Sequence, residues 1–310
     1  MAASEAVDTV GLLSWLEAAA LEELLPLRLR EWNRAAHDRF VRLLACGGAP
    51  ERGRVLIQLL DLLDPQVRPL AVDEIGICGD PATAPQLLLL AEGEVPESTS
   101  PYLRLKAIEA LGRLRELGAK PVLRPLVESK HIWRWVYPRE LRIVAAQALE
   151  KIDHDWAQGF LPQSGLSPAE LSVALLDVPA DWSWVRPRRY ARVQLPRTLA
   201  AVLNTPRGNS RLGIKVLSLS GGVASAERHL SPGALAMLKI QSGFRPVRAQ
   251  VLVREASVGE AGFEIVEMEL EDRARLRRLL GGFVSPSGPV GSGLTTLITK
   301  YTGHKQAFAN

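Results

Sequence analysis

The residues best suited to hold a ligand are arginines gathered past the middle of the chain. Arg188 and Arg192 stand four residues apart, with Arg189 between them. Guanidinium groups stay charged at any cellular pH and can grip phosphate oxygens or a guanine edge through paired hydrogen bonds. The segment therefore predicts an anion-binding site, for which a phosphate ligand, an acidic partner and nucleic acid are all candidates.

Aromatic residues surround these arginines. Trp182, Trp184 and Tyr190 offer π-faces on which a guanine base can stack or a guanidinium can rest. The alternative is that this arginine-rich connector is solvated or pairs with the acidic N-terminal half. We expect the three aromatic residues to contribute stacking contacts if a nucleotide binds.

A second pattern follows downstream, where Ser218 stands three residues before Gly221. Arg-x-x-x-Arg followed by this spacing resembles the PilZ domain, a bacterial receptor module for cyclic di-GMP whose signature continues as Asp/Asn-x-Ser-x-x-Gly. The resemblance implies that Arg188 and Arg192 bind cyclic di-GMP together with Ser218 and Gly221, while Arg189 adds positive charge beside them. Ser218 and Gly221 have a plainer interpretation as turn-forming residues.

One position departs from the family pattern, because Val216 stands where the signature has Asp or Asn. Valine cannot accept a hydrogen bond from guanine, and a charge-assisted hydrogen bond is worth about 1.5–3 kcal/mol, or roughly ten- to a hundred-fold in affinity. Two hypotheses therefore stay open: a cyclic di-GMP receptor, and a degenerate PilZ scaffold that does not bind nucleotide and acts only in protein–protein interaction.

The elements that must position these residues are strands. From Arg192 onward apolar residues alternate along short segments separated by glycine-containing turns, which predicts an antiparallel barrel or sandwich. An Arg/Leu-rich helix over residues 271–280 follows, with its leucines on one side and its arginines around the rest. Strands and helix together resemble a PilZ barrel with its closing helix over residues 185–283.

The N-terminal half contains an internal repeat. Three copies begin at Pro65, Pro101 and Pro138, and each carries an arginine, then a small residue, then an aliphatic residue at helical spacing. The period resembles that of HEAT repeats, which stack helix pairs into a solenoid. We expect the repeat arginines to pair with acidic residues of neighbouring repeats; they are Arg68, Arg104 and Arg142.

The predicted fold class is therefore multidomain α + β, with a HEAT-like α-helical solenoid followed by an antiparallel six-stranded PilZ-type β-barrel and a C-terminal helix. The expected parts are helical repeats over residues 1–162, a helix and linker over 163–184, the barrel domain over 185–283 and a flexible tail over 284–310. A helix over residues 52–63 and a capping box at Ser167 and Glu170 are also expected.

Charge divides unevenly, with a net charge of −4 over residues 1–163 and +8 over 164–310. The basic half could also bind nucleic acid or an anionic membrane without specificity, although we do not expect nucleic acid as the partner. The sequence shows no apolar run of membrane-spanning length, no secretory signal, no metal-ligand cluster and no nucleophile–base pair. Cys46 and Cys78 are expected to be free, buried thiols.

These observations favour a cytoplasmic bacterial signalling adaptor that is not an enzyme and needs no cofactor. The resemblance implies that cyclic di-GMP binds at the barrel and that the helical repeats relay the signal to a protein partner. The connector with its arginines would close over the nucleotide and change how the two parts sit against each other.

Overall fold

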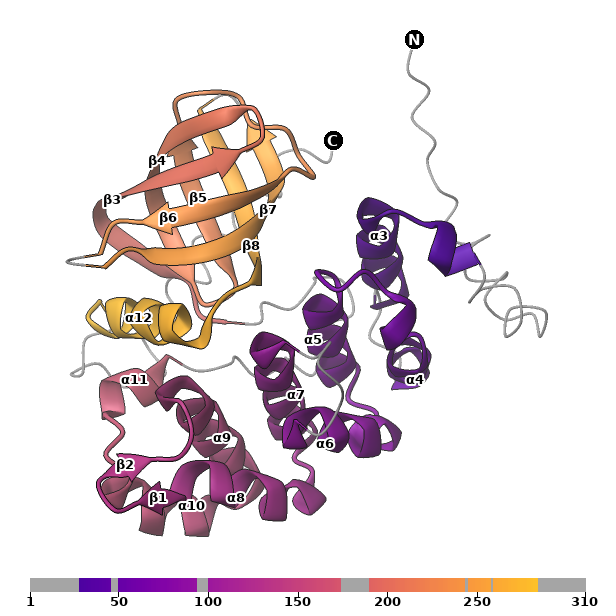
Figure 1. The fold of residues 1–310 in the computed structure, drawn as a ribbon, viewed down its shortest axis with the longest axis vertical. Helices are drawn as coiled ribbons and strands as arrows, with labels where there is room; N and C mark the ends of the chain where they lie inside the picture. Colours follow the sequence, from indigo (N-terminus) through magenta and orange to yellow (C-terminus); the bar gives the residue numbers. More distant parts are fainter. Residues whose placement is uncertain are drawn as a thin grey trace, which may run out of the picture.

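The computed structural model describes residues 28–45, 50–93, 100–173, 190–242, 245–257 and 259–283. A helical N-terminal part comes first, a closed antiparallel barrel of six strands follows, and helix α12 lies between the two (Figure 1). The predicted order of helices, six-stranded barrel and C-terminal helix is confirmed.

The helical part consists of short helices joined by tight turns. Its main helices are α3 (Arg34–Ala45), α4 (Pro50–Gln58), α5 (Arg68–Cys78), α6 (Ala84–Glu92), α7 (Pro101–Leu114), α8 (Lys120–Glu128), α9 (Arg139–Ile152), α10 (His154–Phe160) and α11 (Pro168–Ser172). The prediction of a single helix over residues 52–63 is wrong at its C-terminal end, since α4 stops at Gln58 and a 3-10 turn covers Leu60–Leu62. The capping box of Ser167 and Glu170 is confirmed at the start of α11.

Helices α5, α7 and α9 carry the three copies of the repeat and pack in succession. A Cβ added to Gly76 would lie 2.9 Å from the Cα of Ala110, and one added to Gly112 would lie 2.9 Å from the Cα of Ala148. The same glycine–alanine contact therefore recurs from one repeat to the next. Only the absence of a side chain lets the backbones come this close, which explains why small residues are spaced with the repeat.

The repeat arginines do not make the expected ion pairs. Arg68 donates to the carbonyl oxygen of Leu63 at 3.1 Å, and Arg104 donates to that of Ala91 at 2.7 Å. Arg142, almost fully buried, donates to the carbonyl oxygen of Ser164 at 2.5 Å. The expectation of acidic partners was wrong because turns leave backbone carbonyls without an intrahelical donor, and a long guanidinium can reach them.

The barrel strands are β3 (Val193–Thr205), β4 (Gly208–Ser218), β5 (Gly221–Ala226), β6 (Leu235–Ile240), β7 (Val247–Ser257) and β8 (Glu260–Glu267). Their order around the barrel is β3-β4-β5-β8-β7-β6, closed by the pairing of β3 with β6. Alternate residues point inward and fill the interior with aliphatic side chains, among them Leu203, Ile214, Leu217, Leu238, Ile240 and Val251. The predicted period of two is therefore the inside–outside alternation of a closed barrel.

Two irregularities shape the end of the barrel that meets the helical part. The register of β3 against β4 shifts between Gln194 and Leu199, where Pro196 could not donate to the ladder. At the turn from β4 to β5, Gly221 has φ +148°, and a Cβ there would lie 2.2 Å from the carbonyl oxygen of Phe263. Glycine is therefore required for β5 to pair closely with β8.

Helix α12 (Leu270–Gly281) has two buried faces. Leu276 and Leu280 belong to the barrel core, whereas Leu270 belongs to the core of the helical part. Arg273 and Arg277, two of the arginines around the rest of this helix, are 0% exposed. They are buried because α9 and α11 cover the polar side of the helix (Figure 1).

Several expectations fall outside the described residues. They concern the first helix of the N-terminus, Cys46, the connector over residues 174–189 and the tail from residue 284. Cys78 is free and buried as expected, and burial raises the pKa of its thiol to about 12. Such a thiol is a small core residue rather than a nucleophile.

Candidate functional site

The predicted site residues divide into those that the structure describes and those that it does not. Arg188 and Arg189, together with Trp182 and Trp184, lie outside the described residues. Tyr190, Arg192, Ser218 and Gly221 are described, and all four lie at the end of the barrel where β3 begins and β4 turns into β5.

Tyr190 is buried at the junction between the barrel and the helical part. Its hydroxyl donates to the carboxylate of Glu109 on α7 and accepts from Lys106 Nζ at 2.6 Å and Arg273 Nη2 at 3.1 Å. The ring centroid lies 4.7 Å from Lys106 Nζ, and only 2% of the residue is exposed. In this structure the aromatic ring therefore stacks with cations of the protein itself.

The junction contains a buried, charge-balanced network around Tyr190. Lys106 on α7 pairs with Asp73 at 3.0 Å and with Glu109 at 3.1 Å. Arg273 on α12 pairs with Glu109 at 2.5 Å and with Glu140 of α9 at 2.9 Å. We call these residues, with Arg277, the junction network. Helices from three repeats and the closing helix of the barrel are thus joined through side chains that solvent scarcely reaches.

Arg277 completes the junction network. It lies 2.7 Å from Glu140 and also donates to the carbonyl oxygens of Glu170 and Val173. Burial alone would raise the pKa of Glu140, but the charges and hydrogen bonds of Arg277 and Arg273 hold it below its usual value. Glu140 is therefore a carboxylate that two arginines keep ionised in the interior.

The network also holds Lys106 in its charged form. Burial alone would lower the pKa of Lys106, but Asp73 and Glu109 raise it above the ordinary lysine value. Burial raises the pKa of Tyr190, so its hydroxyl stays protonated and can donate. Removing either partner of such a buried pair leaves an uncompensated charge, which is far more costly than the pair itself.

A second ionic cluster joins α3 to strands β7 and β8 of the barrel. Arg254 of β7 donates to the Asp38 carboxylate from Nη1 at 2.7 Å and from Nη2 at 2.8 Å. Its Nε donates to Glu264 of β8 at 2.6 Å. Arg42 of α3 also reaches both Asp38 and Glu264. The barrel is thus fixed to the helical part at two separate places.

The turn with the second motif is closely packed. Ser218, 1% exposed, donates through Oγ to the carbonyl oxygen of Gly221 at 2.9 Å and accepts from the Ser220 backbone N–H at 3.3 Å. These hydrogen bonds are those of a side chain that closes its own turn. Turn formation accounts for Ser218 and Gly221 whether or not a ligand binds.

Val216 faces outward beside an exposed amide. It pairs in register with Gln194 of β3 on one side and with Val223 of β5 on the other. Directly opposed residues in antiparallel strands point to the same face, with their Cβ atoms about 5 Å apart. Gln194 and Arg192 are both exposed, so a polar group stands next to the position where the family has Asp or Asn.

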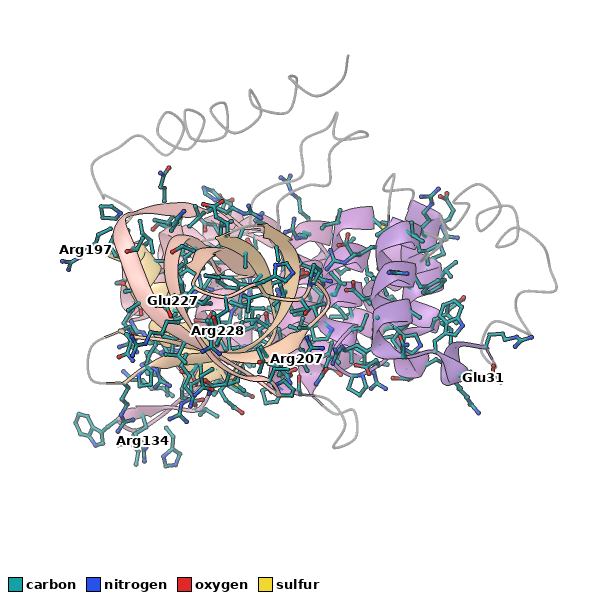
Figure 2. The ribbon with its side chains drawn as sticks, turned by 90° about the horizontal axis from the view of Figure 1, so that it is seen from above. Glu31, Arg134, Arg197, Arg207, Glu227 and Arg228 are labelled. Carbon is teal, nitrogen blue, oxygen red and sulfur yellow. The ribbon has the colours of Figure 1, made fainter. Side chains whose placement is uncertain are left out.

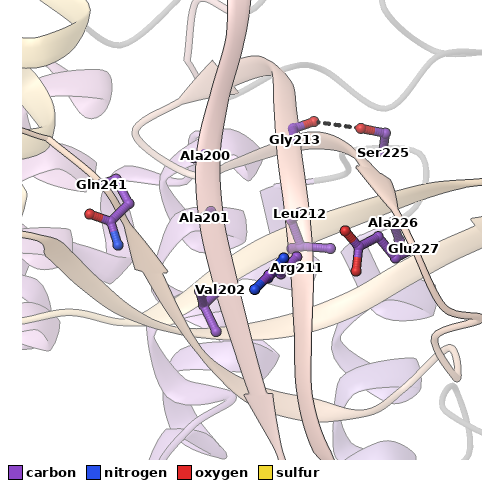
Figure 3. A pocket seen from close by; sticks show the side chains of 10 residues that line it. All are labelled: Ala200, Ala201, Val202, Arg211, Leu212, Gly213, Ser225, Ala226, Glu227 and Gln241. Atoms are coloured by element: carbon purple, nitrogen blue, oxygen red, sulfur yellow. Dashed lines mark hydrogen bonds between the residues drawn. The ribbon is translucent and has the colours of Figure 1, made fainter.

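A shallow hollow of about 720 Å³ lies farther along the outer wall of the barrel. Ala200, Gly213 and Ser225 are register neighbours across three strands and form its floor, and Ser225 Oγ donates to the Gly213 carbonyl at 3.2 Å (Figure 3). Arg211 and Glu227 stand at one end. None of the predicted ligand-binding residues lines this hollow.

Other chemistry finds no support among the described residues. They contain no group of His, Cys, Asp and Glu side chains that could hold a metal ion. Asp153 caps α10 and pairs with Lys120 at 3.0 Å and Arg124 at 2.9 Å, so it serves the fold. Across the same residues, no helix is long and apolar enough to cross a bilayer.

Comparisons with known proteins give one match to describe. No family model and no curated protein matches the sequence. Among solved structures, the chain is similar to the crystal structure of the PilZ domain of CeSA from a cellulose-synthesizing bacterium, at 18% identity and a TM-score of 0.25. The match covers 29% of this chain and 95% of that one.

Sequence reasoning missed the junction network. Arg273 and Arg277 stand four residues apart, so they share one face of α12, and this spacing was the available signal. Their partners Glu109 and Glu140 lie more than 130 residues away in the sequence, beyond the reach of any local pattern.

Proposed function

We propose that this protein is a bacterial signalling adaptor whose barrel is a PilZ-type module for cyclic di-GMP. Arg188, Arg189 and Arg192 would hold the phosphates and guanine edges, and the turn with Ser218 and Gly221 would form the adjoining surface. Exposed Gln194 beside Val216 supplies a polar group where the family signature has an acid or amide. The N-terminal helices, as a HEAT-like solenoid, would present the response to a protein partner.

The observation that carries this proposal is the position of Tyr190. It stands midway between Arg188 and Arg192 in the sequence, and its hydroxyl bonds to Lys106 and Arg273 at the junction. At about 3.3 Å per extended residue, the two residues from Tyr190 to Arg192 span at most roughly 7 Å. A nucleotide that draws these arginines together therefore acts on a segment tied to both parts.

For this coupling to transmit a signal, the nucleotide must bind more tightly in one arrangement of the junction than in another. The junction network offers such a difference, because a shift of Tyr190 changes the hydrogen bonds of Glu109 and Arg273 together. The proposal places the linker of the two parts at residues 163–184, just before the arginines.

Calorimetric titration with cyclic di-GMP at physiological salt tests the proposal. We expect binding by the full chain, and at least tenfold weaker binding by Arg188→Ala. Arg197→Ala is the matched control, because Arg197 is an exposed arginine on β3 outside the arginine pair (Figure 2). The absence of heat with ligand at about 100 µM, equivalent to less than roughly 5.5 kcal/mol of binding free energy, would contradict the proposal.

A second candidate function is that of a scaffold that does not bind nucleotide. It is favoured by the turn itself, where Val216 has no polar side-chain atom and Ser218 is occupied by Gly221 and Ser220. In this case Tyr190 would only hold the barrel against the helical part. If Arg188→Ala and Arg192→Ala change the binding of a partner equally with and without cyclic di-GMP, the scaffold is the better account.

A further inference from the structure

A small β-hairpin projects between the second and third repeats, from the connection of α8 to α9. Its strands β1 (Lys130–His131) and β2 (Arg134–Trp135) pair antiparallel, which leaves Ile132 and Trp133 as the loop. The Val136 backbone N–H donates to the Ser129 carbonyl at 3.2 Å and closes its base. The hairpin lies at the end of the helical part away from the barrel (Figure 1), so the junction network does not depend on it.

The tip of this hairpin exposes large apolar side chains. Trp133 is 89% exposed and Ile132 is 72% exposed, the two highest values among the large apolar residues of the described chain. Val136, at the base, is 55% exposed. Soluble proteins expose single apolar residues routinely, but a cluster of three within five positions marks an interaction site.

The loop backbone is strained. Ile132 has φ +54°, a left-handed conformation that places its Cβ against the backbone and is unfavourable for residues other than glycine. A β-branched residue makes this conformation an outlier at a position where two-residue hairpin loops favour glycine. The sequence therefore keeps a bulky apolar residue at the tip although glycine would fit the turn better.

The base of the hairpin is fastened to the body of the protein. The guanidinium carbon of Arg142 lies 3.4 Å from the centroid of the Trp135 ring, and Lys130 Nζ lies 4.9 Å from it. Arg142 is buried and donates to the Ser164 carbonyl. Trp135 thus contacts two cations, one of them buried in the body of the protein, so Trp133 projects from a firmly held support.

The charge around the tip is positive. Lys130, His131 and Arg134 flank the loop and are exposed, and no acidic residue occurs between Ser129 and Arg139. Figure 2 shows Arg134 at the periphery of the molecule. A surface complementary to this tip has an apolar pocket for an indole ring with carboxylates around its rim.

We propose that this hairpin is a docking site for a protein partner whose binding surface is an apolar pocket rimmed by Asp or Glu side chains. Trp133 and Ile132 would fill the pocket, and Lys130 and Arg134 would pair with the rim. Protein interfaces concentrate their binding free energy in rigid, central Trp and Arg residues, which is the composition found here. The assignment does not depend on nucleotide binding by the barrel.

A membrane surface fits the hairpin less well. Each lysine or arginine near an anionic bilayer adds only a small attraction, and a single weak anchor gives only marginal binding. The tip offers two such cations and two exposed apolar side chains, Trp133 and Ile132, which is a smaller apolar face than an interfacial amphipathic helix buries. The same residues suffice for a protein hot spot, since a buried pocket desolvates both the ring and the ion pairs.

The test uses a phage library that displays genomic fragments of the source organism, each long enough to fold. The library is panned on the full-length protein after depletion on Trp133→Ala. We expect selected fragments, once purified, to bind the wild-type protein at least tenfold more tightly than Trp133→Ala. We also expect Arg134→Glu to weaken binding at least fivefold, with recovery when an acidic residue of the fragment is changed to lysine.

Leu117→Ala is the matched control, because Leu117 is another exposed apolar side chain, 64% exposed, and it precedes α8 whereas the hairpin follows α8. It should leave the affinity unchanged, and unaltered circular dichroism and melting of each variant show that folding is intact. The proposal is overturned if no fragment depends on Trp133, or if Arg134→Glu has no effect. It is equally overturned if Trp133 is needed only for binding to phosphatidylglycerol vesicles.

Discussion

Arg273 of α12 and Glu109 of α7, 164 residues apart in the sequence, lie 2.5 Å from each other in the interior of the protein. Arg273 is 0% exposed and Glu109 is 3% exposed. An ion pair at this depth is stable only when both charges are fully compensated, so it holds the closing helix of the barrel in one place relative to the helical part. Tyr190, midway between Arg188 and Arg192 in the sequence, forms hydrogen bonds with both Glu109 and Arg273.

Glu140→Gln should strongly destabilise the protein. Glu140 is the shared carboxylate of Arg273 and Arg277, and its neutralisation leaves buried Arg277 with backbone carbonyls alone and Arg273 with Glu109 as its remaining carboxylate. We expect a fall in the free energy of unfolding of about 3–5 kcal/mol, measured by urea denaturation. Glu260→Gln is the control, since Glu260 and Lys215 form an exposed pair worth less than about 1 kcal/mol. Equal losses in both variants would contradict this account.

Tyr190→Phe and Tyr102→Phe form a matched pair. Both tyrosines are buried against Lys106 and Arg273, but within the described chain the Tyr102 hydroxyl has no hydrogen-bond partner. Tyr190→Phe should cost about 1–3 kcal/mol, because it leaves charged partners short of a hydrogen bond. Tyr102→Phe should be neutral or slightly stabilising. Similar melting temperatures for the two variants would show that the Tyr190 hydroxyl contributes nothing to the junction.

Glu267 should make the stability of the protein depend on pH. Burial raises its pKa to about 7, against an ordinary value of 4.5, while the Ser100 hydroxyl at 3.4 Å opposes this rise. The folded protein therefore binds this proton more tightly than the unfolded chain, so stability falls as pH rises from about 4.5 to 7 and stays reduced above that.

Glu267→Gln removes this ionisation. The variant should be more stable than the wild type at pH 8 and should lose most of that advantage at pH 4.5, as measured by melting temperature across the range. A constant difference in melting temperature between wild type and variant at all pH values would mean that Glu267 does not change its protonation between pH 4.5 and 8.

Gly221→Ala should disrupt the turn that carries the second motif. The added Cβ would lie 2.2 Å from the Phe263 carbonyl oxygen at φ +148°. Gly208→Ala is the control, since φ there is also positive, at +114°, but an added Cβ would meet no neighbouring atom within 4 Å. Overpacking costs about 1–3 kcal/mol beyond backbone strain, so Gly221→Ala should lose that much more than Gly208→Ala. Equal losses would indicate that β5 can move away from β8.

Local patterns predicted most of the architecture. The alternation from Arg192 onward predicted an antiparallel barrel or sandwich, and the structure has a closed barrel. The repeated glycine–alanine contacts show why the helical period was visible in the sequence. What remained hidden were contacts between distant segments. The burial of Arg273 and Arg277 could not be predicted, since nothing nearby in the sequence indicates Glu140 as their partner.

The candidate site was visible only in part for the same reason. Arg192, Ser218 and Gly221 do gather at one end of the barrel, as the order of the motifs suggested. Tyr190, expected to be a stacking surface for a base, has its ring between Lys106 and Arg273 of other segments. The spacing of Arg188 and Arg192 gives no sign that Tyr190 contacts the helical part, because that contact depends on how the barrel and the helical part pack together.

The central claim, that a nucleotide signal reaches the helical part through Tyr190, is tested most directly by hydrogen–deuterium exchange with and without cyclic di-GMP. In the wild type, the nucleotide should change amide protection in α7 and α12. In Tyr190→Phe, cyclic di-GMP should still bind, but the change in α7 should be lost. An identical response of α7 in both proteins, at matched nucleotide occupancy, would contradict the account.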